Sequence, residues 1–180
     1  MDGDQAPIGI LIVSDRAFRG EYEDRGGPAV KNWLEGRFSD PPPFVLRLVP
    51  DDIDTIEQEI QDLGTICSLV VTTGGTGIGP RDFTPEATKR ACSTMIPGFG
   101  EKMRAASWEA VPTAILSRSV AGLIGTCLVV NLPGNPKAIG ECLEAIWSAI
   151  PHAIEIAGGP SWQARGAARS PHPPSESKSS

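Results

Sequence analysis

Histidine is scarce in this chain: His152 and His172 are the only two among 180 residues. A Ser-His-Asp or Cys-His site would have to use His152, and no nucleophile motif lies near it in the sequence. Histidine-rich metal sites are disfavoured for the same reason. The simpler interpretation places His152 at a surface or a helix end, so we expect chemistry that needs no histidine base.

Basic charge and long apolar runs are also lacking. The chain carries 16 Lys and Arg against 22 Asp and Glu, a net charge of -6, whereas a nucleic-acid or anionic-membrane binder needs a basic face. No apolar stretch is long enough to span a bilayer, and the acidic start MDGDQ lacks the apolar segment of a secretory signal. We expect a cytoplasmic protein that binds neither nucleic acid nor a membrane. Small anions remain compatible, because backbone N–H groups bind phosphate without net positive charge.

Closely spaced cysteine pairs are lacking as well. The four cysteines are widely spaced and form no Cys-x-x-Cys motif: Cys67, Cys92, Cys127 and Cys142. Buried, reduced thiols are favoured over disulfides or a metal site.

Apolar strand-like runs and segments of helical period alternate along the chain. Strands are expected over 8–13, 44–49, 69–72, 114–116, 120–124 and 128–132, and helices over 28–36, 53–63, 84–91, 99–106 and from Pro136 towards Ile156 with a break at Pro151. This order predicts an α/β fold with a largely parallel sheet, three layers and a small hairpin. We expect one domain over residues 1–157 and a disordered Pro/Ser-rich tail over 158–180, where apolar residues become rare.

Residues 69–86, LVVTTGGTGIGPRDFTPE, have the elements of a phosphate-binding loop. An apolar strand leads into four closely spaced glycines, and Thr84, Pro85 and Glu86 are typical of a helix start, with Thr84 as N-cap. The segment nevertheless fits neither a P-loop, which needs Lys before Ser or Thr, nor the dinucleotide fingerprint, where Pro80 takes the place of a glycine.

Three more polar clusters follow predicted strands: residues 14–16 (SDR), 51–52 (DD) and 131–137 (NLPGNPK). Carboxyl ends of parallel strands share one edge of a sheet, so these clusters and the glycine loop could converge on one crevice. Each also has a simpler explanation. Asp51 could complement a helix dipole, residues 133–136 form an ordinary turn sequence, and Arg81 and Asp82 could be a local ion pair.

Seven stretches together resemble the bacterial molybdopterin adenylyltransferase family, whose relatives include the plant cofactor-synthesis G domain and the gephyrin G domain. They are SDRA at 14–17, TGGTG at 73–77, PRD at 80–82, TPEAT at 84–88, PGFG at 97–100, LSR at 116–118 and NLPG at 131–134. The resemblance runs from about Ile8 to Ile156. It implies transfer of AMP from Mg-ATP to the terminal phosphate of molybdopterin, with release of pyrophosphate.

The resemblance also implies roles for individual residues. Asp51 and Asp82 would be catalytic and would hold Mg²⁺ at the triphosphate, since carboxylate oxygens suit that ion. A phosphate and pterin cradle would be formed by Gly74, Gly75, Thr76 and Gly77. Further contacts to molybdopterin or the nucleotide would come from Ser14, Asp15, Ser107, Asn131, Gly134 and Lys137. A homotrimer and a hand-off of product to the molybdate-insertion enzyme are implied too.

Two departures and two alternatives accompany this resemblance. Ile78 and Gly79 occupy the variable part of the loop, and Ile124 stands where many relatives carry Arg. A non-catalytic molybdopterin-binding or scaffold module is the main alternative, disfavoured because both candidate carboxylates are present. The related molybdate-insertion step ranks lower, because the chain has no room for the extra domains of those proteins.

Overall fold

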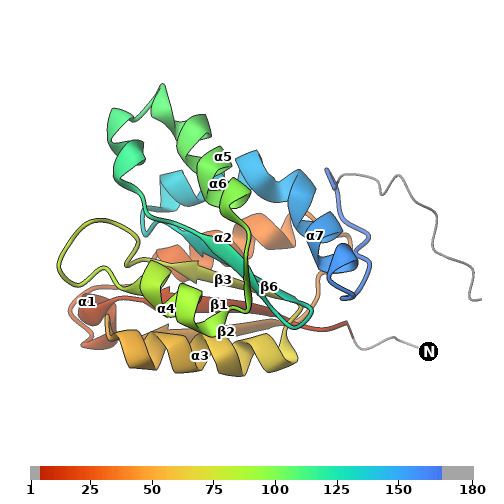
Figure 1. Ribbon diagram of the computed structural model, residues 1–180, viewed down its shortest axis with the longest axis horizontal. Coiled ribbons are helices and arrows are strands. Elements are labelled where there is room, and N and C mark those ends of the chain that lie inside the picture. The colour runs from red at the N-terminus through yellow and green to blue at the C-terminus, as the bar shows by residue number, and fades with distance from the viewer. Residues whose placement is uncertain (1–4, 168–180) are drawn as a thin grey trace, which may run out of the picture.

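The computed structural model describes residues 5–167. A mixed six-stranded sheet has the strand order β2-β1-β3-β6-β5-β4 (Figure 1). Four neighbouring strands run parallel: β2 (Phe44–Val49), β1 (Ile8–Val13), β3 (Leu69–Thr73) and β6 (Cys127–Leu132). The antiparallel strands β5 (Ala121–Ile124) and β4 (Thr94–Met95) complete one edge. The predicted α/β fold with a largely parallel sheet and a small hairpin is confirmed.

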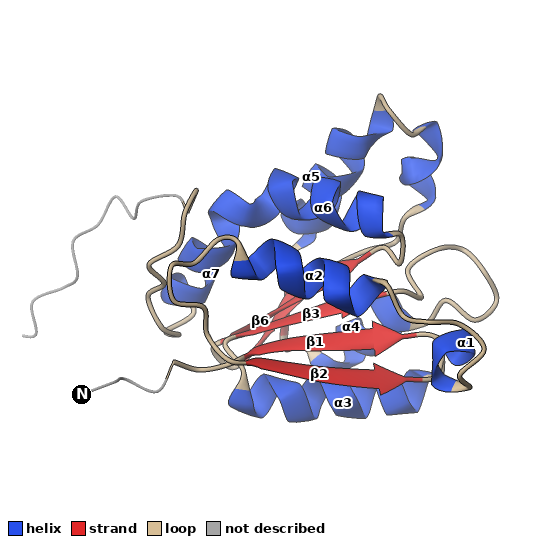
Figure 2. Ribbon diagram, turned by 180° about the vertical axis from the view of Figure 1, so that it is seen from behind, coloured by secondary structure: helices blue, strands red, loops and turns tan. Residues whose placement is uncertain are grey.

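Helices cover both faces of the sheet in three layers (Figure 2). One face carries α2 (Gly26–Glu35), α5 (Pro97–Trp108), α6 (Pro136–Ile146) and α7 (Ile150–Ile156), and the other carries α3 (Ile53–Ile66) and α4 (Thr84–Ala91). Ile10 of β1 belongs to the first core and Leu11 to the second. The central strands are therefore apolar at successive positions, because neither face meets water.

Several local predictions were wrong. The expected strand at residues 114–116 is part of a 3-10 helix, η1 (Pro112–Leu116), and leaves Ile115 62% exposed. The last helix breaks at η2 (Trp147–Ala149), while Pro151 lies in the first turn of α7, where a missing N–H costs nothing. The short elements α1 (Asp15–Phe18) and β4 were not predicted, because a few residues give no periodic signal.

The predicted start of a disordered tail at Gly158 also needs correction. Trp162 is only 9% exposed and packs edge-to-face on Phe38, with ring centroids 5.4 Å apart. Arg165 bonds through its main chain in two directions: its N–H donates to the Arg37 carbonyl at 2.8 Å, and its carbonyl accepts from the Trp147 indole at 2.6 Å. The polar composition of this segment predicted disorder, but the single residue Trp162 anchors it to the core. Residues 168–180 of the predicted tail lie outside the described residues.

The four cysteines are free thiols, and three of them are buried. Burial raises the pKa of Cys67 and Cys92 to about 11 and that of Cys127 to about 12. These thiols therefore stay protonated and act as small apolar groups. Across residues 5–167, no helix has the length and apolar character needed to cross a membrane.

Candidate functional site

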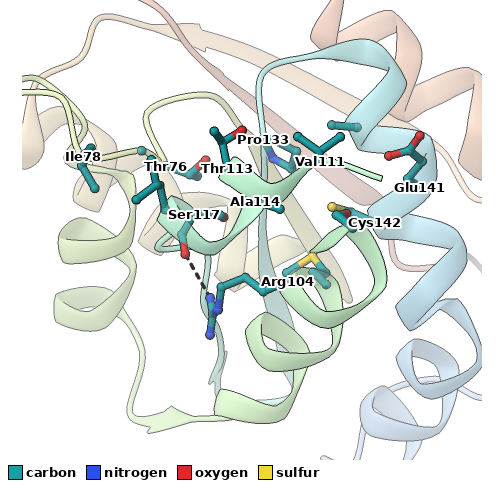
Figure 3. A pocket seen from close by; sticks show the side chains of 15 residues that line it. Thr76, Ile78, Arg104, Val111, Thr113, Ala114, Ser117, Pro133, Glu141 and Cys142 are labelled. Atoms are coloured by element: carbon teal, nitrogen blue, oxygen red, sulfur yellow. Dashed lines mark hydrogen bonds between the residues drawn. The ribbon is translucent and has the colours of Figure 1, made fainter. Parts of the chain in front are cut away.

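Two cavities lie beside the glycine loop at the carboxyl ends of the parallel strands, and a third, more open one lies beyond Ile78 and Gly79. The polar cavity, of about 260 Å³, is lined among others by Ser14, Asp51, Gly74, Gly75, Asp82 and Gly134. The apolar cavity, of about 370 Å³, is lined among others by Thr76, Gly77, Met103, Ser107, Val111 and Cys142 (Figure 3). The loop contributes successive residues to both cavities, so groups bound in the two would meet along it.

Glycine is required at the first two loop positions. Gly74 and Gly75 have φ values of +99° and +63°, in the region that side chains other than glycine rarely adopt. A Cβ on Gly74 would lie 2.3 Å from the Val13 carbonyl oxygen, and one on Gly75 would lie 2.4 Å from Oγ1 of Thr84. The loop therefore passes closer to β1 and α4 than any larger residue would permit.

Thr84 fixes the first half of the loop. Its hydroxyl donates to the Gly74 carbonyl at 2.8 Å, and its N–H donates to the Gly75 carbonyl at 3.1 Å. The prediction that Thr84 is the N-cap of α4 was wrong, because the helix begins at Thr84 and Phe83 precedes it. The side chain is engaged with the loop instead.

Arg118 holds the second half. Its main-chain N–H donates to the Thr76 carbonyl at 2.9 Å, and its Nε donates to the Gly77 carbonyl at 2.6 Å. The carbonyl of one residue and the N–H of the next point in opposite directions across a trans peptide. Four successive N–H groups thus face away from Thr84 and Arg118, and none donates to a protein group within residues 5–167: Gly75, Thr76, Gly77 and Ile78.

A row of unpaired amides of this kind is an anion-binding feature, because backbone N–H groups need acceptors.

The two departures from the family pattern, at residues 78–79 and at Ile124, do not open the loop. Gly79 donates its N–H to Asp82 Oδ2 at 2.7 Å and accepts from the Asp82 N–H at 3.1 Å, which closes a tight turn. Ile124 lies away from both cavities and packs against Gly64 of α3.

The carboxylate of Asp51 is held at the end of β2 by a reciprocal pair of bonds with Asp15. Asp51 Oδ2 accepts the Asp15 N–H at 2.7 Å, and Asp15 Oδ1 accepts the Asp51 N–H at 3.0 Å. Arg81 donates to Asp15 Oδ2 at 2.6 Å and to the Asp51 carbonyl at 3.0 Å, so it pairs with Asp15 and not with its neighbour Asp82. This arrangement fixes both aspartates to one corner of the sheet.

The pKa values of the two aspartates at that corner are shifted in opposite directions. Desolvation raises the pKa of Asp51, and the nearby charges of Asp15 and Asp82 add to this, against the hydrogen bond from Asp15 and the charge of Arg81. The hydrogen bond from Arg81 holds the pKa of Asp15 below its ordinary value. Of these two carboxylates, Asp51 is thus the one whose negative charge the protein compensates less well.

Asp51 and Asp82 suit a metal ion that arrives with its own ligands. Both carboxylates line the polar cavity, and within the described part of the chain no group of three or more His, Cys, Asp or Glu could hold a metal. Mg²⁺ is commonly bound by one or two carboxylates together with substrate phosphates and water. The donor set fits such an ion and does not form a closed protein cage.

Most of the other predicted site residues come together here. Ser14 lines the polar cavity and also caps α1 by accepting the Ala17 N–H at 3.2 Å. Gly134 lines the same cavity, and Ser107, 9% exposed, lines the apolar one. Asp15 lines neither cavity and contacts the site through Asp51.

Two predicted residues are not brought into the site. Asn131 is fully buried, and its amide group donates to the hydroxyls of Thr72 and Thr88 at 3.0 and 2.8 Å, which ties β6 to β3 and α4. The Lys137 side chain is 87% exposed and lies 3.9 Å from Glu141. Asn131 lies within β6, one residue before its end, and Lys137 lies in the first turn of α6, but in both cases packing decides the direction of the side chain.

Sequence reasoning also missed residues that the structure places here. Tyr22 and Asp24 line the polar cavity, and Arg104 and Glu141 line the apolar cavity. Asp24 accepts the N–H groups of Gly26 and Gly27, a capping signal that could have been recognised. The others lie on helices or in loops without a local motif.

Comparison with known proteins agrees with this geometry. A family model described as a probable molybdopterin binding domain matches residues 9–152. A molybdopterin adenylyltransferase of Helicobacter pylori is 50% identical over 151 residues, covering 83% of this chain and 86% of that protein. The molybdopterin adenylyltransferase of Escherichia coli K12 is 42% identical over 167 residues, covering 85% of this chain and 86% of that protein.

Solved structures give the same grouping. The molybdopterin biosynthesis enzyme MoaB of Thermus thermophilus has a TM-score of 0.78 at 40% identity, covering 88% of this chain and 100% of that one. The molybdopterin biosynthesis Mog protein of Mycobacterium ulcerans also has a TM-score of 0.78, at 36% identity, covering 84% of this chain and 98% of that one.

Proposed function

Since the chain belongs to the family of molybdopterin-binding domains, we propose that it is a molybdopterin adenylyltransferase. The reaction joins the terminal phosphate of molybdopterin to the α-phosphate of ATP and releases pyrophosphate. The product, adenylylated molybdopterin, is an activated intermediate of molybdenum-cofactor synthesis.

The observation that carries the proposal is the row of free amides between the two cavities, flanked by Asp51 and Asp82. A phosphate nucleophile is already ionised at neutral pH, so the site needs no general base, in keeping with its lack of histidine. Such a transfer depends on bringing two anions into line and on neutralising the charge that develops. Fixed N–H donors beside paired carboxylates are suited to both tasks.

The two cavities divide the substrates by chemistry. The polar cavity, with Ser14, Asp51 and Asp82, suits the triphosphate of ATP. The apolar cavity, with Met103, Val111 and a few polar groups such as Ser107, suits a ring system that needs orientation as well as burial. The phosphate of molybdopterin would then meet the nucleotide along the glycine loop.

Mg²⁺ is the proposed metal, and Asp51 and Asp82 would hold it. Bound there, it would neutralise phosphate charge at the polar cavity, since Arg81 and Arg118 are already engaged. Arg81 is engaged with Asp15, and Arg118 with loop carbonyls and Glu86. The proposal also includes a cytoplasmic homotrimer that hands its product to the molybdate-insertion enzyme, supported by the family resemblance of the seven motifs.

Incubation of the protein with molybdopterin, MgCl₂ and ATP labelled at the α-phosphate tests the proposal. We expect labelled, adenylylated pterin and one pyrophosphate per transfer, and loss of both products when EDTA is added. An Asp51→Asn, Asp82→Asn double variant is the matched control, since it should bind pterin without turnover. Wild-type protein that binds molybdopterin but forms no product would instead be a binding or scaffold module. Sedimentation velocity tests the homotrimer separately.

A further inference from the structure

We propose that Arg118 is a positioning residue of the adenylyl-transfer site, which fixes the peptides that present the Gly77 and Ile78 amides to substrate phosphate. The inference rests on the proposed function and deepens it. Arg118 lines neither the polar nor the apolar cavity. It lines a third, more open cavity of about 440 Å³ with Ile78, Gly79 and Asp82, but its guanidinium is engaged with loop carbonyls and Glu86, so its effect on the reaction would pass through the glycine loop.

One arginine bonds three carbonyls of the same loop. Its main chain binds the Thr76 carbonyl, Nε binds that of Gly77, and Nη2 binds that of Asp82. The guanidinium thus links the middle of the loop to its end, and the planar fork fixes the spacing between the two attachment points. The remaining nitrogen, Nη1, pairs with the Glu86 carboxylate on α4, which orients the guanidinium against a helix.

The direction of each amide follows from the carbonyl bonds. With the Thr76 and Gly77 carbonyls held by Arg118, the N–H groups of Gly77 and Ile78 must face the other way, where no protein acceptor among the described residues takes them. The bond to the Thr76 carbonyl comes from the main chain, so it does not need the side chain. Glycine peptides rotate easily, so without the guanidinium the peptide between Gly77 and Ile78 could flip and turn its carbonyl oxygen towards an anion. The bond to the Asp82 carbonyl also fixes the backbone of a proposed catalytic carboxylate.

Arg118 could have a simpler role as a structural ion pair with Glu86, and substitutions distinguish this role from loop positioning. If Arg118 only forms an ion pair with Glu86, the pair is partly exposed and of modest value. Glu86→Gln would then match Arg118→Ala in effect, and Arg118→Lys would preserve function. If Arg118 positions the loop, Glu86→Gln leaves the carbonyl bonds in place and lowers kcat by less than about fivefold. Lysine, a single-point donor, cannot reproduce the fork and should cost about tenfold in kcat.

Steady-state kinetics with molybdopterin and Mg-ATP provide the first test. For Arg118→Ala we expect kcat to fall about a hundredfold while KM for each substrate changes less than tenfold, because both cavities remain but the phosphates lose alignment. Millimolar guanidinium should restore part of the lost kcat. The matched control is Arg90→Ala, which removes a half-exposed α4 arginine paired with Asp54 and should keep normal kcat. A normal kcat in Arg118→Ala would overturn the proposal.

A second readout does not depend on turnover. Pyrophosphate, a product of the proposed reaction, should shift the ¹⁵N–¹H signals of residues 75–78 in the wild-type protein. Arg118→Ala keeps the main-chain bond to the Thr76 carbonyl but loses the Nε bond to Gly77, so the shift of Ile78 should be lost while those of residues 75–77 persist. Arg90→Ala should retain all of them. Equal shifts in wild type and Arg118→Ala would overturn the role of Arg118. Wild-type protein that shows these shifts but no adenylyl transfer would sink the proposed function while leaving the positioning role supported.

Discussion

The two ends of the parallel strands are built in opposite ways. The C-terminal segment and α7 lie at the opposite end of the sheet from α1 (Figure 2). Beside that segment, Phe38 packs edge-to-face on Trp147 and Trp162, with centroids 5.9 and 5.4 Å apart. At the α1 end, four loop amides have no protein partner among residues 5–167, and Asp51 is partly buried near two other aspartates. The aromatic end is held together mainly by apolar contacts, although the Trp162 indole N–H is buried there without an acceptor in the described part of the chain. The ligand end instead leaves a row of amides for a ligand to satisfy.

The largest expected effect breaks the ligand end alone. Gly75→Val introduces a Cβ 2.4 Å from Thr84 Oγ1 and 3.3 Å from Asp51 Oδ1, at φ +63°. The loop must move, so we expect adenylyl transfer to fall by more than about a thousandfold. Gly98→Val is the matched control, because a Cβ there meets nothing within 4 Å. Normal molybdopterin binding and turnover in soluble Gly75→Val would mean that the loop is only a structural turn.

The next effect breaks the aromatic end. Trp162→Ala removes a side chain that is 9% exposed, and we expect a loss of about 3 kcal/mol in the free energy of unfolding. Thermal unfolding should shift down by about 6–12 °C. Transfer by the protein that remains folded should be normal, because Trp162 lines neither the polar nor the apolar cavity.

Truncations locate the boundary of this aromatic end. A chain ending after Gly159 loses both Trp162 and the Arg165 main-chain bonds, so it should melt at least as early as Trp162→Ala. A chain ending after residue 167 keeps these contacts and should melt like the full chain. Equal melting of all three proteins would show that the contacts beyond Gly158 do not stabilise the fold.

How far the sequence alone could lead also differs between the two ends. The ligand end could be predicted, because glycine spacing and acidic pairs after apolar runs are local signals. They placed Asp51, Gly75 and Asp82 at one edge of the sheet. The aromatic end was not accessible. Trp162 stands alone in a polar segment, and nothing local indicates that Phe38 and Trp147, distant in sequence, form its partners.

Side-chain direction was the other limit. Asn131 lies near the end of β6, yet Thr72 and Thr88 hold its side chain in the core and away from the site. Arg118 was recognised only as part of a motif, because its bonds reach the loop 36 to 42 residues earlier in the chain. Contacts between such distant segments arise from the fold and carry no sequence period.

An electrostatic change at the ligand end should act on rate and not on stability. Asp82→Asn keeps the acceptor for the Gly79 N–H but removes the negative charge. We expect kcat to fall about a hundredfold, the scale of losing one electrostatic contact in the transition state, with pterin affinity maintained. Asp62→Asn, on an exposed carboxylate of α3, is the matched control. Single-turnover rates at saturating Mg-ATP measure the difference, and near-normal rates would remove Asp82 from the mechanism.

The smallest expected effect is a change in stability at the ligand end, where removing a carboxylate should stabilise the fold. Folding raises the pKa of Asp51, chiefly by desolvation. The native state then favours the protonated carboxyl, so stability is fully present below the ordinary pKa of 3.8 and decreases as pH rises through the folded value. Asp51→Asn removes this penalty. At pH 7 we expect a melting temperature up to about 3 °C above wild type, with slower adenylyl transfer, and the stability gain should disappear below pH 3.8.

The adjacent residue supplies a control of opposite sign. Hydrogen bonds from the Thr55 hydroxyl and N–H lower the pKa of Asp52, so its carboxylate stabilises the fold at neutral pH and this contribution is lost as pH falls. Asp52→Asn should therefore melt slightly below wild type at pH 7 and approach it in acid. Thermal melts of both variants between pH 3 and 8 test the contrast. If Asp51→Asn melts below wild type at pH 7, desolvation does not dominate at Asp51, because removing a well-compensated charge would cost stability.

If Asp51→Asn instead melts above wild type and transfers AMP more slowly, the ligand end retains a carboxylate that destabilises the fold. That result is expected of a group kept for catalysis.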